Sequence, residues 1–97
     1  MAEIRQTLFF SRWFRSIRDR QAKFRIQARI DRLHTGYLGD TKSVGGGLME
    51  LRIFYGPGYR VYFIYKNDTL YLILGGDKKS QQKDVEVAKQ LAKQIED

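Results

Sequence analysis

The sequence predicts a single α+β domain with the element order β-α-α-β-β-β-α. Apolar residues recur with helical spacing before residue 36 and again after residue 80. Between these segments lie three short runs rich in aromatic and β-branched residues, separated by turn sequences. The length of 97 residues suits one domain with one compact core, so we assign residues 1–97 to a single domain.

The N-terminal part is predicted to form a short strand and two helices. Residues 3–7 form the strand, and Thr7 is a suitable N-cap for the helix that follows. The apolar residues of this first helix are Phe10, Trp13, Phe14 and Ile17. Gly36 is placed to end the second helix, and His34 in its last turn is expected to be a surface capping residue. The apolar stripe of the second helix is Ala22, Ile26, Ile30 and Leu33.

Residues 36–47 are rich in glycine and are predicted to form a loop, which contains Lys42. The run Gly45-Gly46-Gly47 indicates a flexible or closely packed backbone. No Lys-Ser or Lys-Thr pair follows these glycines, so the loop is not a nucleotide-binding P-loop.

Three strands are predicted next, in an antiparallel meander. They cover Leu48–Tyr55, Tyr59–Lys66 and Thr69–Leu74. Gly56-Pro57-Gly58 joins the first two strands, and Asn67-Asp68 joins the last two.

We assume that Tyr55 lies opposite Tyr59 and that Lys66 lies opposite Thr69 across the two hairpin turns. Because side chains alternate along a strand, these pairings assign the strand residues to two faces of the sheet. One face is almost wholly apolar and is therefore the core: Met49, Leu51, Ile53, Tyr55, Val61, Phe63, Tyr65, Leu70, Leu72 and Leu74. The opposite face is mixed and is treated as an outer face: Glu50, Arg52, Phe54, Arg60, Tyr62, Ile64, Tyr71 and Ile73.

Two arginines on this second face have two possible explanations. Arg52 and Arg60 are expected to lie diagonal to each other, flanked by Tyr62. An ion pair with Glu50, one pleat from Arg52, would make them ordinary polar residues of an outer face. Alternatively, the two guanidinium groups bind a phosphodiester, and an aromatic side chain stacks on a base.

The end of the third strand is also basic. Gly75 and Gly76 are expected to loosen the strand end, and Lys78 and Lys79 then precede a helix N-terminus, where phosphate is favoured. An ordinary basic loop is the alternative. Ser80 is a possible N-cap for this last helix, whose apolar residues are Val85, Ala88, Leu91, Ala92 and Ile95.

The charge is concentrated in the first 36 residues, which hold nine basic side chains, eight of them Arg, against three acidic ones. The whole chain has a formal net charge of +7. This distribution fits binding to nucleic acid or to an acidic protein surface, and a solvated helix face with no partner is the alternative. The sequence has no cysteine and one histidine, so neither a disulfide framework nor a metal site is expected, and a cytoplasmic location is the default. No apolar run is long enough for a membrane span.

Three segments carry a resemblance to a known family: Gly45–Ile53, Tyr55–Phe63 and Leu74–Gln81. Together they resemble the addiction-module killer proteins, which are HigB-like and phage Gp49-like members of the RelE/ParE toxin superfamily. The similarity covers nearly the whole chain, including the Arg-rich second helix and the Gly39-Asp40-Thr41-Lys42 segment.

The resemblance implies a RelE/ParE-like toxin of a type II toxin–antitoxin system. Its two N-terminal helices would pack on a twisted antiparallel sheet, with the first strand at the edge. RelE- and HigB-type relatives are metal-independent endoribonucleases that cleave mRNA, usually in the ribosomal A site. In that reaction the 2′-hydroxyl attacks the adjacent phosphate.

By position, Arg60 matches the strand arginine that such enzymes use at the scissile phosphate, and Lys78 or Lys79 matches their basic residue at the end of the last strand. The family's C-terminal tyrosine or histidine is missing here, so no general base is identified. The expected catalytic residues are Arg52, Arg60, Tyr62, Lys78 and Lys79. The expected RNA contacts are Arg25, Arg29, Arg32, Lys42 and Tyr71.

The expected partners are a helix-turn-helix, HigA-like antitoxin, the ribosome and mRNA, with operator DNA bound only through the antitoxin. No cofactor and no membrane partner are expected. Two other functions remain open. One is ParE-like inhibition of DNA gyrase without nuclease activity, which the missing acid and base groups favour. The other is a non-catalytic nucleic-acid-binding module, which would show strongly salt-dependent binding.

Overall fold

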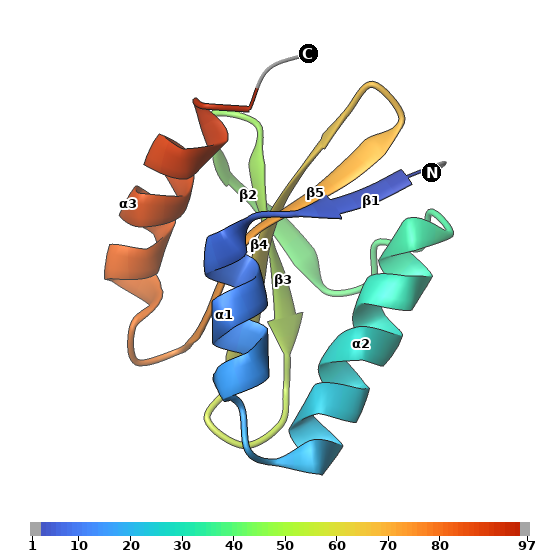
Figure 1. Ribbon diagram of the computed structural model, residues 1–97, viewed down its shortest axis with the longest axis vertical. Helices are drawn as coiled ribbons and strands as arrows, with labels where there is room; N and C mark the ends of the chain where they lie inside the picture. Colours follow the sequence, from blue (N-terminus) through green and yellow to red (C-terminus); the bar gives the residue numbers. More distant parts are fainter. Residues whose placement is uncertain (1–2, 96–97) are drawn as a thin grey trace.

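The chain forms one five-stranded sheet with helices on both faces (Figure 1). The computed structural model describes residues 3–95, and the α+β class predicted from the sequence is confirmed, with one additional strand. The elements along this part of the chain are β1 (Glu3–Gln6), α1 (Leu8–Ser16), α2 (Arg20–His34), β2 (Thr41–Gly45), β3 (Leu48–Ile53), β4 (Tyr59–Lys66), β5 (Thr69–Asp77) and α3 (Gln81–Ala92).

The strand order in the sheet is β1-β5-β4-β3-β2. Strands β2 to β5 form an antiparallel meander. β1 lies at the edge, as predicted, but it runs parallel to β5, so the prediction of an entirely antiparallel sheet is wrong at this edge. Parallel neighbours need a long crossover connection, and here α1, α2 and three strands separate the two partners in the chain.

Residues 41–45, which were expected to lie in a loop, form the opposite edge strand β2. Lys42 lies opposite Glu50 of β3. Gly46 and Gly47 have φ values of 65° and 81° and make the tight turn between the two strands. The loop prediction is wrong because pairing with β3 outweighs the weak strand propensity of this segment.

The register between β3 and β4 differs from the predicted one by two residues. Ile53 lies opposite Tyr59 rather than Val61. The reason is that residues 54–58 form the connection, in which the Gly58 N–H donates to the Tyr55 carbonyl at 3.1 Å. A shift of two residues keeps every side chain on its predicted face. Between β4 and β5 the predicted pairing of Lys66 with Thr69 is confirmed.

A bulge in β5 changes one face assignment. Phe63 lies opposite Leu72, but the preceding Tyr62 lies opposite Leu74, so Ile73 is an extra residue on the β5 side. Leu74 therefore packs with the residues of the second face, and its predicted place in the first core is wrong. No turn signal in the sequence marks this bulge.

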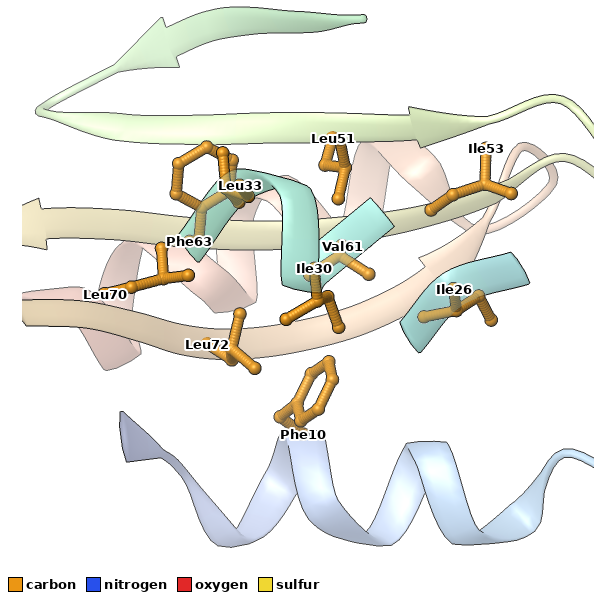
Figure 2. Packing of buried hydrophobic residues seen from close by; sticks show 10 residues of the cluster. All are labelled: Phe10, Ile26, Ile30, Leu33, Leu51, Ile53, Val61, Phe63, Leu70 and Leu72. Carbon is orange, nitrogen blue, oxygen red and sulfur yellow. The ribbon is translucent and has the colours of Figure 1, made fainter. Parts of the chain in front are cut away.

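Helices α1 and α2 cover the first face of the sheet. Thr7 is the N-cap of α1, as predicted, and its hydroxyl accepts from the Phe10 N–H at 3.0 Å. α2 is capped by Asp19 and ends before Gly36, whose φ of 98° suits glycine. Figure 2 shows side chains of both helices pointing onto β3, β4 and β5. This core consists of Phe10, Ile26, Ile30, Leu33, Leu51, Ile53, Val61, Phe63, Leu70 and Leu72.

Helix α3 covers the second face, where an open outer face was expected. Its apolar stripe buries a second, smaller core of Leu48, Tyr62, Ile64, Ile73 and Ala88. The expectation is wrong because helical periodicity shows that α3 has an apolar stripe but not which surface the stripe covers. The arginine face of the sheet is thus largely an interior.

Gly75 and Gly76 lie within β5 and allow close packing, rather than loosening the strand end. A Cβ atom on Gly75 would collide with the ring of Trp13, and one on Gly76 would collide with the carboxylate of Asp84. Glycine at these two positions lets α1 and α3 approach opposite faces of the same strand.

Candidate functional site

Arg52 and Arg60 lie directly opposite each other on β3 and β4, not diagonally. Side chains in such a pair share one face of the sheet, with Cβ atoms about 4.5–5.5 Å apart. Two like charges in this position repel each other unless each has its own counter-charge. Each arginine has one: Asp40 for Arg52 and Glu50 for Arg60.

The Arg52 side chain is anchored to the segment before β2. Its Nη2 and Nε donate to Asp40 Oδ1 at 2.6 and 3.2 Å, and its backbone N–H donates to the Asp40 carbonyl at 3.0 Å. The guanidinium lies 5.7 Å from the centre of the exposed Phe54 ring. Because the Arg52 side chain is still about one-third exposed, it remains accessible to an anion from solvent.

Arg60 is much more deeply placed. The residue is 7% exposed, and its Nε lies 3.9 Å from Oε1 of Glu50, which is completely buried. The other carboxylate oxygen of Glu50 accepts a hydrogen bond of 2.8 Å from Gln81 Nε2, in the first turn of α3. Arg60 Nε and Glu50 Oε1 make no hydrogen bond to any residue in the range 3–95. The pair is therefore a buried charge contact supported from one side by α3.

The structure separates the two lysines that the sequence left as alternatives. Gly58 lies between Lys78 and Arg60: a Cβ atom at this position would be 3.4 Å from Lys78 Cβ and 3.8 Å from Arg60 Nη1. Lys78 is thus next to the arginine pair. Lys79 lines a shallow hollow on the outer side of α3, together with Lys83.

A hydrogen-bond network holds the turn that carries Lys78. The Ser80 N–H donates to Asp77 Oδ1 at 3.1 Å, and the Ser80 hydroxyl donates to Asp84 Oδ2 at 2.5 Å. Ser80 is the N-cap residue of α3, as predicted, but its side chain makes no capping bond to the helix. This network fixes the start of α3 relative to the end of β5.

Tyr62 is unsuited to the role expected of it. The residue is completely buried beneath α3, and its hydroxyl has no hydrogen-bond partner among residues 3–95. Burial raises the pKa of Tyr62, and the nearby carboxylates of Glu50 and Asp84 raise it further. The side chain is therefore neutral and out of reach of a substrate.

The remaining expected RNA contacts are spread over the molecule. Lys42 is exposed on β2 and lines a hollow with Gln81, close to the Glu50 position. Tyr71 lies opposite Ile64, four residues along β4 from Arg60, or roughly 13 Å. The structure therefore brings Lys42 near the arginine pair but not Tyr71.

The arginines of α2 lie on a different surface from Arg60. Arg25, Arg29 and Arg32 line a groove between α2 and the end of β3. Arg25 lies over the ring of Tyr55 at 4.7 Å, and Arg29 Nη1 donates to the Arg52 carbonyl at 3.0 Å. Arg29 thereby connects the groove to the strand that carries the arginine pair.

Sequence reasoning missed three residues that position the arginines. Glu50 was considered only as an ion-pair partner for Arg52, one pleat away, whereas it contacts Arg60. Asp40 was named only as part of a loop segment, and it holds Arg52. Gln81 has no signal in the sequence, because its role depends on where α3 packs.

The fold of this chain is similar to that of a bacterial toxin. The structure matches that of a free Escherichia coli toxin RelE carrying two Arg-to-Ala substitutions, with a TM-score of 0.64 over 87% of this chain and 94% of that chain. Sequence identity in this match is 11%, so the match establishes the RelE fold alone.

The chain belongs to the family of phage-derived Gp49-like proteins (DUF891), whose model matches residues 12–95. It is also 47% identical over 94 residues to an uncharacterized protein of Haemophilus influenzae, covering 96% of this chain and 95% of that protein. The family and fold predicted from the sequence are thus confirmed. Within residues 3–95, no helix combines the length and apolar character needed to cross a membrane.

Proposed function

We propose that this chain is the toxin of a type II toxin–antitoxin pair and acts as a metal-independent endoribonuclease on mRNA at the ribosome. The observation that carries this proposal is the pairing of Arg52 and Arg60 on adjacent strands, with Lys78 beside Arg60. Three cations around one position suit a phosphodiester group, because two strands hold the arginines and a hydrogen-bonded turn holds Lys78 before substrate arrives.

The proposed reaction is attack of a ribose 2′-hydroxyl oxygen on the adjacent phosphorus. The new O–P bond gives a 2′,3′-cyclic phosphate, and the bond to the 5′-oxygen breaks. Arg60 and Lys78 stabilise the negative charge that builds up on the phosphate oxygens in the transition state. Arg52 binds the same phosphate or its neighbour, because it is the more exposed of the two arginines.

Both proton transfers of this reaction are proposed to involve groups that do not belong to this chain. The carboxylates nearest the arginine pair are engaged: Glu50 is buried against Arg60, and Asp40 holds Arg52. Tyr62 is buried as well. We therefore propose that the acceptor of the 2′-hydroxyl proton and the donor to the 5′-oxygen are water or groups of the ribosome, which also positions the mRNA.

The test is induced expression in bacteria with transcriptome-wide mapping of RNA 5′ ends. The wild type is expected to stop growth and create new 5′ ends within coding sequences, and Arg60→Lys and Arg60→Gln are expected to do neither. Arg12→Gln, which removes an exposed charge from α1, is the matched control and should behave as the wild type. Circular dichroism of the purified variants checks that they fold. Cleavage by folded Arg60→Gln at the wild-type rate would contradict the proposed site.

The burial of Tyr62 favours one alternative, a ParE-like gyrase inhibitor, since it removes a candidate acid–base residue. The same cultures separate the two functions. Intact transcripts together with trapped gyrase–DNA complexes would support the alternative and overturn the nuclease proposal. In either case the expected partner is an antitoxin, and co-expression of the neighbouring reading frame should restore growth.

A further inference from the structure

A groove of about 400 Å³ lies between α2 and the end of β3, outside the arginine pair. Its walls carry two phenylalanines, Phe24 and Phe54, and three arginines, Arg25, Arg29 and Arg32. No Asp or Glu is among the residues that line it. The two hydrophobic cores do not include these aromatic and arginine side chains, so core packing does not explain why they are combined in one groove.

The two phenylalanines are unusually open to solvent. Phe24 is 70% exposed and Phe54 is 73% exposed, and they are the most exposed large apolar side chains among residues 3–95. Scattered exposed apolar residues are common on protein surfaces, but here both line the same groove. Their exposed ring faces are therefore available to a planar ligand.

The groove continues into the proposed catalytic surface. Arg29 Nη1 donates to the carbonyl of Arg52 at 3.0 Å, and the Arg52 guanidinium lies 5.7 Å from the Phe54 ring centre. Phe54 therefore stands between the arginine pair on one side and α2 on the other. A strand of nucleic acid with a phosphate at Arg52 can reach Phe54 with a neighbouring base.

The chemistry of the lining favours a nucleic-acid strand over a protein helix. A helix would need a continuous aliphatic surface, whereas this groove offers two ring faces separated by guanidinium groups. Aromatic side chains stack on any base, and arginines bind the phosphates between the bases. No carboxylate lines the groove to cancel this charge, and the nearby Asp40 is already paired with Arg52.

We propose that this groove binds unpaired bases of a single-stranded RNA whose backbone continues to Arg52 and Arg60. Phe24 and Phe54 are the stacking surfaces, and Arg25, Arg29 and Arg32 contact phosphates. The inference rests on the proposed function for the identity of the ligand as RNA, and it adds the path by which the strand leaves the cleavage site.

The experiment is equilibrium binding of a fluorescein-labelled 2′-O-methyl RNA of roughly 12 nucleotides, long enough to span such a site. The methyl group blocks attack by the 2′-oxygen, so binding is measured without cleavage. Anisotropy titrations of the purified protein are run at several salt concentrations between about 50 and 200 mM. Thermal melts of each variant confirm that it is folded.

Phe24→Leu and Phe54→Leu are each expected to weaken binding about tenfold without changing its salt dependence, because they remove a stacking face and no charge. Phe54→Tyr should bind as the wild type. Arg25→Gln and Arg32→Gln should each reduce the slope of log affinity against log salt by about 0.7. The control is Phe9→Leu, an exposed phenylalanine of α1 outside the groove, which should bind as the wild type.

The inference is overturned if the wild type shows no saturable binding, or if both Phe→Leu variants bind with wild-type affinity. It is also overturned if those variants bind RNA normally but no longer retain the co-expressed antitoxin, since the groove would then be a protein interface. Failure of the proposed function looks different: Arg60→Gln would cleave mRNA as the wild type does, while Phe54→Leu would still weaken RNA binding.

Discussion

Arg60 lies against a carboxylate that solvent does not reach, with its Nε 3.9 Å from Oε1 of Glu50. Gln81 holds the other oxygen of that carboxylate at 2.8 Å. A buried cation is costly unless an opposite charge accompanies it, so Glu50 allows an arginine to occupy this position in the sheet. Glu50 is therefore a positioning residue for Arg60, and α3 supports the arrangement through Gln81.

Glu50→Gln is expected to destabilise the protein by about 3–5 kcal/mol, because the buried Arg60 charge loses its counter-charge. Gln81→Met removes only the hydrogen bond and is expected to cost about 1.5–3 kcal/mol. Denaturant unfolding measures both values. At temperatures where Gln81→Met is fully folded, its maximal cleavage rate should fall more than its affinity for RNA. A fall in neither quantity would contradict the positioning role.

Lys78→Gln is expected to reduce cleavage about 100-fold, since Lys78 lies beside Arg60 and one charge-stabilising group would be lost. Lys79→Gln removes an equal charge from the adjacent residue, which faces the hollow shared with Lys83, and should reduce cleavage little. Single-turnover cleavage on programmed ribosomes compares the two. Equal effects would mean that only the net charge of the turn matters.

Tyr62→Phe is expected to retain full cleavage activity, because the Tyr62 hydroxyl is buried away from the arginine pair's exposed side. The free energy of unfolding should be unchanged or higher by about 1 kcal/mol, since the variant removes a buried hydroxyl without a hydrogen-bond partner. Chemical denaturation and the cleavage assay test these statements. A large loss of activity with unchanged stability would restore Tyr62 as a catalytic candidate.

Asp19→Asn is expected to lower the melting temperature by a few degrees at neutral pH and to have less effect in acid. The Tyr55 hydroxyl and the Ala22 N–H donate to this carboxylate and lower the pKa of Asp19 below its ordinary value of 3.8. A depressed pKa in the folded state contributes stability that is present above pH 3.8 and is lost as pH falls through the folded-state value. Melts of both proteins from neutral to acidic pH test this. A pH-independent difference would mean that the charge of Asp19 contributes nothing.

Gly75→Ala is expected to destabilise the protein by about 1–3 kcal/mol, because the new methyl group enters the space of the Trp13 ring. In a Trp13→Leu background the same substitution should cost less, since the smaller side chain leaves room. The four proteins form a double-mutant cycle, and urea unfolding gives the coupling energy. Additive effects would show that Trp13 does not limit this position.

Much of the fold follows from local patterns. The apolar stripes of α1 and α2, the Thr7 cap and the hairpin at Asn67-Asp68 are set by nearby residues, and all are confirmed. The features that were missed depend on contacts distant in the chain. β2 is a strand because β3 lies beside it, and the bulge at Ile73 appears only when β4 and β5 are paired.

The candidate site divides in the same way. Alternation along the strands places Arg52 and Arg60 on one face, and that placement holds even though the register differs by two residues. The packing of α3 decides the rest: it buries Tyr62 and brings Gln81 to Glu50. The choice between Lys78 and Lys79 depends on the turn before α3, whose geometry no spacing rule predicts.

The parallel pairing of β1 with β5 also has a consequence for the order of events during synthesis. β1 is made before its partner residues 69–72, which follow it by 66 residues (69 − 3) in the chain. Contacts of such large sequence separation form late, since the intervening loop must close before they contribute. Arg60 likewise obtains its support only once Gln81 is available. The arginine site therefore forms only after residues 40 to 81 have all left the ribosome, so it is absent from a shorter nascent chain.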